Sequence, residues 1–290
     1  MYRAFTLIFM VLVPVGVGCD TRPTAAPAQT ATQPPAPPAP GRTVPPTPAD
    51  ESLTPEEYIR LGMPAHDRVW LGHDMAQAEK VLVSVAAGGG RRLPRYRSDR
   101  SGAVFTRMTA TENLDGLRNR GTTIGVRFPL AISHFQATNQ ILKLYLGVFV
   151  KGEVRDSEMV ELVGSQLRAT VVALDLVDEF IPTLDKDDPT YSNRMRGLER
   201  IRGGLGGVVA GSLQTLTERE THRADERARL VGYMEATLPR LVPRLLPGSR
   251  AETLTRLEAM QTDPTLADLQ PGLGRLRERV LAALDGSSAP

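Results

Sequence analysis

The sequence has one cysteine among its 290 residues, and only 5% of its residues are aromatic. A single cysteine excludes a disulfide within the chain, so the fold depends on its apolar core even in an oxidising compartment. The formal net charge of +2 provides no overall electrostatic field for nucleic acid or for an anionic membrane. Few aromatics beside many leucine, valine and alanine residues favour helices over a β-sandwich.

Several motifs that carry chemistry are absent. The chain has no Gly-x-Ser-x-Gly and no Cys-x-x-Cys-His. Its glycine run at 203–207 lacks the Lys-Ser/Thr pair that ends a phosphate-binding loop, which excludes a nucleotide site there. No internal repeat of 20 to 50 residues is visible. We therefore predict no cofactor and no bound metal.

What is present is most distinctive in the first twenty residues. Arg3 supplies one positive charge, and an apolar run of about 13 residues follows from Phe5 to Val17. That run is too short to span the hydrocarbon core of a bilayer as a helix. Gly18 and Cys19 follow it, immediately before the composition changes. A charged start, a short apolar core and small residues at the end are typical of a secretory signal.

This arrangement resembles the signal of a bacterial lipoprotein, in which the cysteine is lipidated and becomes the mature N-terminus. The resemblance covers residues 1–20 and departs from the family pattern at Gly16, where leucine is usual. It implies lipidation of Cys19 and a site on the periplasmic side of the bacterial cell envelope. Asp20 matches an inner-membrane retention signal of enteric lipoproteins, but the choice between inner and outer membrane stays open. An ordinary secretory signal with an unmodified thiol is the alternative.

Residues 20–50 are rich in proline, alanine and threonine, and ten of these 31 residues are proline. Such a segment buries too little apolar surface to offset the entropy lost on ordering. In a polyproline II conformation it would reach about 95 Å. The predicted organisation is a signal peptide over 1–18, a disordered lipid-anchored linker over 19–50 and a helical domain over 51–290.

Apolar spacing predicts an all-α fold, an irregular multi-helix bundle, after residue 50. Thr54-Pro55-Glu56-Glu57 is a helix start with a capping box. Residues 122–128 are expected to be extended, and no sheet is predicted. The remaining helices are expected over 74–87, 103–108, 112–117, from 129 through about 149, from a cap at Asp156 to Leu184, from 188 through the glycine run, 230–246, from a capping box at Ser249 to Met260, and 270–285.

Two of these helices have unusual patterns. The helix from Asp156 is apolar over most of its circumference, so it is expected at the centre of the domain. Its solvent-facing side is predicted to be a narrow stripe of Glu158, Glu161, Ser165, Arg168, Asp175 and Glu179. In the later helix, five glycines lie within 203–211, which disfavours a helix by about 5 kcal/mol relative to alanine. Either another backbone approaches Gly203, Gly207 and Gly211 closely, or the helix breaks.

An arginine-rich segment, which we call the arginine loop, is the strongest candidate binding site. Arginine guanidinium groups bind phosphates and carboxylates bidentately. Anionic envelope polymers, lipid headgroups and acidic proteins are candidate partners, and nucleic acid is not expected. The alternative is a solvated loop whose arginines pair with the chain's own carboxylates. The candidate anion-binding residues are Arg91, Arg92, Arg95, Arg97 and Arg100.

Histidines supply the other candidate chemistry. His66-Asp67 and His73-Asp74 recur seven residues apart and could share a metal or a proton, but the aspartates also suit turns or helix starts. His134 lies on an apolar helical face, where a buried, hydrogen-bonded imidazole is expected. A second possible metal cluster, better interpreted as a charged helix face, comprises Glu218, Glu220, His222, Asp225 and Glu226.

The sequence therefore predicts a lipid-anchored envelope protein with a non-enzymatic helical scaffold or binding module. The alternative is a metal-dependent or hydrolytic envelope enzyme centred on His66, His73 and the arginine loop 91–100. A third possibility is a pocket for a small apolar ligand within the helical hairpin 129–184.

Overall fold

The computed structural model describes residues 50–119, 121–149, 155–217 and 223–287, and within them it contains helices and no β-strand. The all-α prediction is confirmed. The predicted signal peptide and nearly all of the linker, with Cys19, lie outside the described residues. None of the described helices combines the length and apolar content needed to cross a membrane. The helices are α1 Pro55–Arg60, α2 Gly72–Ala87, α3 Gly102–Thr109, α4 Glu112–Arg118, α5 Ile124–Phe149, α6 Asp156–Phe180, α7 Tyr191–Thr217, α8 Ala224–Leu241, α9 Pro247–Thr262 and α10 Gln270–Ser287.

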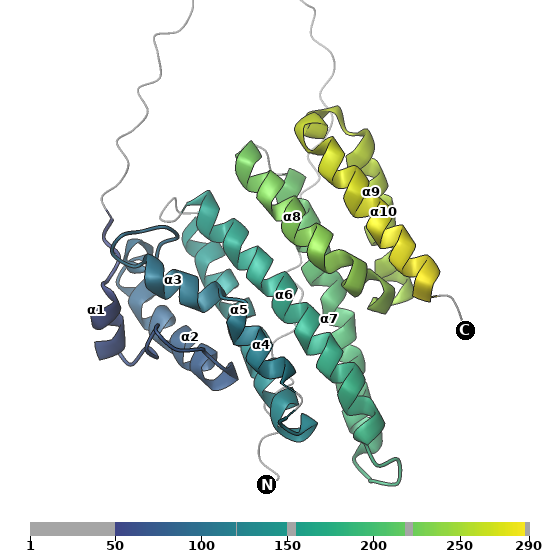
Figure 1. Ribbon diagram of the computed structural model, residues 1–290, viewed down its shortest axis with the longest axis horizontal. Helices are drawn as coiled ribbons and strands as arrows, with labels where there is room; N and C mark the ends of the chain where they lie inside the picture. Colours follow the sequence, from purple (N-terminus) through teal and green to yellow (C-terminus); the bar gives the residue numbers. More distant parts are fainter. Residues whose placement is uncertain (1–49, 120, 150–154, 218–222, 288–290) are drawn as a thin grey trace, which may run out of the picture. The chain divides into compact units, whose positions relative to one another are not determined.

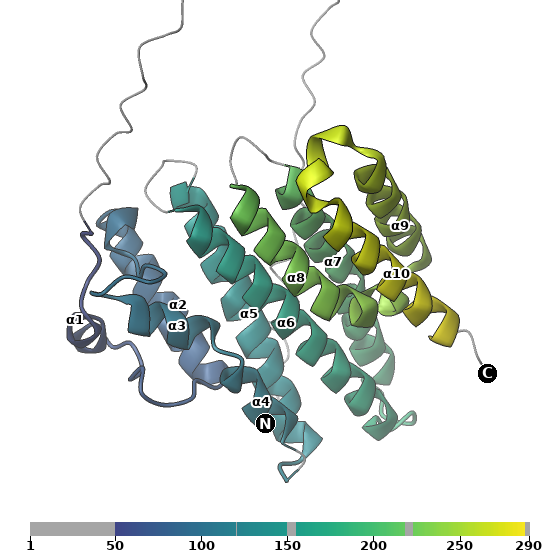
Figure 2. The same ribbon diagram turned by 45° about the horizontal axis from the view of Figure 1, so that its top comes forward.

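Five of the longer helices form a row in which each packs on the next. The order is α2, α5, α6, α8 and α10, as Figures 1 and 2 show. Helix α7 packs against α6, α8 and α9, and α9 also contacts α10. Helices α5 and α6 are joined across residues 150–154 and make the most extensive helix pair of the described chain. The helices therefore bury their apolar faces mainly against neighbours in the row.

Helix α6 is the centre of this arrangement, as its sequence predicted. Most of its 25 residues are buried. It supplies side chains to all three hydrophobic cores: Met159 to the one with α2 and α3, Val172 to the one with α4 and α5, and Leu167 to the one with α7 to α10. A helix surrounded on nearly all sides needs apolar residues around most of its circumference.

The polar stripe predicted for α6 is wrong over its first half. Glu158, Glu161 and Ser165 are buried, with exposures of 0%, 7% and 3%. Farther along the helix, Glu179 is exposed as predicted. Asp156 does not cap the helix; the N-cap is Arg155, whose backbone N–H donates to Glu158 at 2.8 Å. Hydrophobicity alone could not show that partners elsewhere in the chain cover these polar groups.

The ends of α5 and α6 also differ from prediction. Residues 124–128 are helical rather than extended, because Thr123 accepts the backbone N–H groups of Val126 and Arg127 and so begins α5. Helix α6 ends at Phe180, before Leu184, since Pro182 has no N–H to continue it and a 3₁₀ turn follows.

The glycine-rich segment is helical throughout α7. The predicted close approach does not occur at Gly207 or Gly211, where an added Cβ would meet no atom within 4 Å. At Gly203 the nearest atom to an added Cβ is a side-chain carbon of Leu246 at 3.9 Å. The tight contact at Gly206 is with a side chain, not a backbone: a Cβ there would lie 2.5 Å from Ser249 Oγ of α9. The helix is held by buried Leu205, Val209 and neighbouring apolar side chains on its other face.

The proline-rich helices begin and end at different residues than expected. Helix α8 begins at Ala224 rather than Leu230, continues through Pro239 and ends at Leu241. Pro247 is the first residue of α9, so Ser249 lies inside that helix and is not its N-cap. Pro247 has no N–H to donate, which is harmless in the first turn of a helix, whereas Pro239 lies inside α8, two residues before its end. The capping box of α1 is confirmed: Thr54 and Glu57 bond each other's backbone N–H groups.

Candidate functional site

The arginine loop lies against the first described residues of the chain. Arg91 pairs with Glu51 at 3.4 Å, and Arg100 pairs with Glu57 at 3.5 Å. All four side chains are 36% to 51% exposed, so solvent screens both ion pairs and they contribute little to the stability of the fold. Two of the five candidate arginines therefore contact the chain's own carboxylates.

The other loop arginines also make internal contacts. The backbone carbonyl of Arg92 accepts the Tyr58 hydroxyl at 2.5 Å, although its guanidinium group is exposed. Arg97 adopts a positive φ of 57° and places its guanidinium carbon 4.9 Å from the centre of the Tyr96 ring. Burial would raise the pKa of Asp50, but hydrogen bonds from Ser52 and Ser98, and after them the positive charge of Arg95, lower it. The loop thus fastens residues 50–58 to the body.

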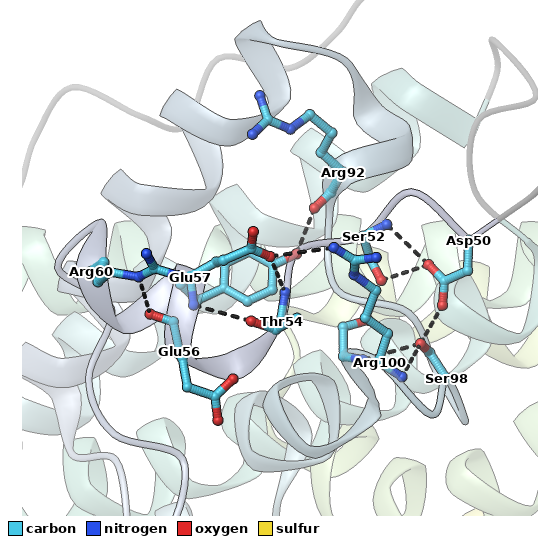
Figure 3. Close-up of polar contacts among 11 residues, drawn as sticks. Asp50, Ser52, Thr54, Glu56, Glu57, Arg60, Arg92, Ser98 and Arg100 are labelled. Atoms are coloured by element: carbon cyan, nitrogen blue, oxygen red, sulfur yellow. Dashed lines mark hydrogen bonds and ion pairs between the residues drawn. The ribbon is translucent and has the colours of Figure 1, made fainter.

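Asp50, the first described residue, is held by two serines (Figure 3). Its carboxylate accepts the Ser52 N–H at 3.0 Å and also the hydroxyls of Ser52 and Ser98. Burial opposes ionisation, but the hydrogen bonds from both serines outweigh it and lower the pKa of Asp50. Asp50 is therefore held to the rest of the described chain by hydrogen bonds from its carboxylate to Ser52 and Ser98.

The inner side of the arginine loop is bonded to α6. Glu158 accepts the backbone N–H of Tyr96 at 2.9 Å and that of Arg155 at 2.8 Å. Burial raises the pKa of Glu158, and the nearby charge of Arg95 and both hydrogen bonds only partly offset that effect. The guanidinium groups of Arg97 and Arg229 lie over the Tyr96 ring, 4.9 and 5.1 Å from its centre.

Arg229 is part of a polar cluster between α6 and α8 that the sequence pattern did not reveal. It pairs with Glu226 and, at 3.3 Å, with Glu161. Glu161 also accepts the Tyr233 hydroxyl at 2.7 Å. Gly164 makes room for the Tyr233 ring, because a Cβ there would overlap it. Only the i, i+3 spacing of Glu226 and Arg229 could have indicated part of this cluster.

The two His-Asp pairs have different environments. His73 is two-thirds exposed at the start of α2, 3.4 Å from Asp74. Asp74 accepts the backbone N–H of Leu71 at 3.0 Å and pairs bidentately with Arg68 at 2.6 and 3.1 Å. Asp74 therefore supports the helix start, one of the two roles considered from the sequence.

His66 instead lines an open pocket of about 370 Å³, together with residues of α3 and the first residue of α4. Its Nδ1 and the Nη1 of Arg107 are buried and have no hydrogen-bond partner among the described residues. Neither His73 nor any arginine of the loop lines this pocket. The structure does not bring the three parts of the alternative enzyme site into one pocket.

The remaining candidates are placed as follows. His134 is 1% exposed, and burial lowers its pKa to about 4, so the imidazole is neutral at pH 7. Of the acidic cluster, Glu218, Glu220 and His222 lie outside the described residues, while Asp225 is exposed and Glu226 is buried against Arg229. Across the described ranges, no three His, Cys, Asp or Glu side chains are placed to hold a metal ion. The α5–α6 hairpin lines neither of the two best-formed pockets.

Comparison of the chain with protein-family models, with curated proteins and with solved structures finds no match.

Proposed function

We propose that this chain is a lipoprotein of the bacterial cell envelope whose helical body is a non-enzymatic binding module or scaffold. Cys19 would carry the lipid, and the proline-rich linker would hold the body away from the bilayer on the periplasmic side. The membrane would be one partner, through the lipid, and an envelope protein or anionic envelope polymer the other. Two or more acyl chains give stable anchoring without a contribution from the protein surface.

The observation that carries the proposal is the order of three features: a signal-like segment, the chain's only cysteine at its end, and a linker with ten prolines among 31 residues. The way the body begins adds support. Asp50 is bonded to Ser52 and Ser98, and Glu51 and Glu57 pair with the arginine loop. A helical body whose N-terminal residues are held by these contacts suits a protein that is anchored through its N-terminus.

Membrane fractionation tests this proposal. One form is the full chain; the other replaces residues 1–19 with a cleavable secretory signal that carries no lipidation cysteine, so the chain from Asp20 is exported without lipid. We expect the full chain in the membrane pellet after a high-salt wash and in the supernatant after detergent. We expect the unlipidated form in the periplasmic fraction. An unlipidated form that pellets as firmly as the full chain would contradict the proposal.

A further inference from the structure

The pocket beside His66 is built on one face of α3. Ala103, Thr106 and Arg107 line it, at the i, i+3 and i+4 spacing of a single helical face, and Ala110, the residue that follows α3, lines it as well. The opposite face of α3 is buried in the core with α2 and α5, through Phe105 and its neighbours. A ligand could therefore bind the pocket-lining face of α3 and leave the packing of its core face unchanged.

Hydrogen bonds hold the walls of the pocket in place. Arg107 Nε donates to the backbone carbonyl of His66 at 3.0 Å, which joins the loop before α2 to α3. Asn113 donates to the carbonyl of Arg107 at 2.6 Å and accepts the backbone N–H of Trp70 at 2.8 Å. Trp70 and Asn113 are both fully buried. A site whose walls are already ordered loses little entropy when a ligand binds.

The polar groups of the pocket carry both signs of charge. Arg107 provides a guanidinium cation, and His66 and Thr106 provide an imidazole and a hydroxyl. Glu112, at the start of α4, provides a carboxylate on the same pocket. The buried Arg107 Nη1 and His66 Nδ1 lack partners among the described residues. Buried polar atoms of this kind usually have a hydrogen-bond partner, and a ligand carboxylate in the pocket would be an acceptor for the Arg107 guanidinium group.

We propose that this pocket binds a small zwitterion of the α-amino acid type. The ligand carboxylate would bind the Arg107 guanidinium group, with His66 and Thr106 beside it, and the ligand ammonium group would face Glu112. A guanidinium group matches the two oxygens of a carboxylate. Glu112 disfavours phosphate and dicarboxylates, whose second negative charge it would repel. Ala103 and Ala110 make the apolar wall, and a volume of about 370 Å³ is at the small end of ligand pockets.

Equilibrium dialysis of the full chain in detergent, with radiolabelled L-alanine as the probe, tests this site. Acetate, methylammonium and inorganic phosphate are added as competitors. We expect saturable binding of one L-alanine per chain at concentrations up to about 10 mM, with each competitor at least tenfold weaker because it satisfies only one of the two charges. Absence of binding in that range would overturn the proposal. Displacement by acetate or phosphate as effective as displacement by unlabelled alanine would also overturn it.

Two variants separate the two charges. Arg107→Lys keeps the positive charge but loses the paired N–H donors of the guanidinium group. Glu112→Gln keeps the size of the side chain but loses its negative charge. Each is expected to weaken alanine binding at least tenfold, whereas Glu258→Gln, at an exposed site on α9, leaves it unchanged. Arg107→Lys also removes the hydrogen bond from Arg107 Nε to the His66 carbonyl, so this variant could fail to fold. In that case Glu112→Gln, a substitution at an exposed position, tests the zwitterion assignment by itself. Unchanged binding in Glu112→Gln would overturn the zwitterion assignment. The assay does not depend on whether Cys19 is lipidated, so it can fail while the proposed anchoring holds.

Discussion

Glu158 of α6 accepts the backbone N–H of Tyr96 at 2.9 Å, a contact between residues 62 positions apart in the chain. The same carboxylate accepts the N–H of Arg155 at the start of its own helix. One buried side chain therefore both caps the central helix and holds the arginine loop against it. The loop in turn carries Ser98, which bonds the first residue of the body, Asp50.

Substitution of Glu158 tests this double role. Glu158→Leu leaves both N–H groups without an acceptor and is expected to lower the free energy of unfolding by about 1–3 kcal/mol. Glu158→Gln retains one acceptor oxygen, so its loss should be smaller. Urea unfolding at pH 7 measures both, and Glu258→Gln is the exposed control. Equal stability of Glu158→Leu and the parent would show that these bonds do not hold the loop.

The attachment of Asp50 can be measured by a double-mutant cycle. Ser98→Ala removes the hydroxyl that donates to Asp50 and accepts two backbone N–H groups, so a loss of about 1–2 kcal/mol is expected. Combined with Asp50→Ala, the loss should be smaller than the sum, because the two residues share one interaction. Glu51→Gln, which breaks only the exposed pair with Arg91, should change stability by less than about 0.5 kcal/mol. Strict additivity of the Asp50 and Ser98 substitutions would contradict the contact.

Neighbouring glycines of α7 should respond in opposite directions to alanine. Gly207→Ala adds a Cβ to open space and should stabilise the fold by about 1 kcal/mol, the difference in helix propensity. Gly206→Ala places a Cβ against Ser249 and should destabilise it by about 1–3 kcal/mol. Ser249→Gly in the Gly206→Ala background should recover most of that loss. Thermal and urea unfolding distinguish the two, and the same sign for both substitutions would mean that α9 does not pack at Gly206.

Burial of His134 predicts an acid-dependent loss of stability. Its pKa falls from the ordinary 6.5 to about 4 in the fold, so between these values the unfolded chain binds the proton and the folded chain does not. The stabilising contribution is complete above pH 6.5 and is lost as the pH falls towards 4, by up to about 3 kcal/mol. His134→Leu should remove this part of the pH dependence. Urea midpoints of parent and variant, compared at pH 7.5 and 5, measure it, and an equally acid-sensitive variant would show that His134 is not the cause.

Much of the fold follows from local patterns in the sequence. The threonine and glutamate that begin α1, and the apolar periodicity of α6, indicated those helices and the central place of α6. The predictions were wrong where residues far away in the sequence determine whether a polar side chain is buried. The spacing of three glutamates, Glu158, Glu161 and Glu226, is typical of a solvent-exposed helix face. All three are nevertheless buried, and each has a partner from elsewhere in the fold or the next helical turn: Tyr96, Tyr233 and Arg229, respectively. Helix periodicity reports which residues are polar, not which of them find partners in the folded chain.

The candidate site was predictable only in pieces. His66 and the arginine loop were identified by residue type and spacing, and the loop does contact the chain's own carboxylates at Glu51 and Glu57. Arg107 was missed because a single arginine on a short helix has no sequence signature. Its role depends on the bond from its Nε to the carbonyl of His66, 41 residues earlier in the chain. Such a pocket forms only when the loop fixed by Trp70 folds over α3.

Metabolic labelling with radioactive palmitate tests the lipid anchor most directly, because it reports acylation itself rather than sedimentation. The parent chain and Cys19→Ser are expressed in the same bacterium, and each is immunoprecipitated after labelling. The account predicts that the parent carries the label and that Cys19→Ser carries none. A parent chain without label, or a serine variant labelled to the same extent, would contradict it.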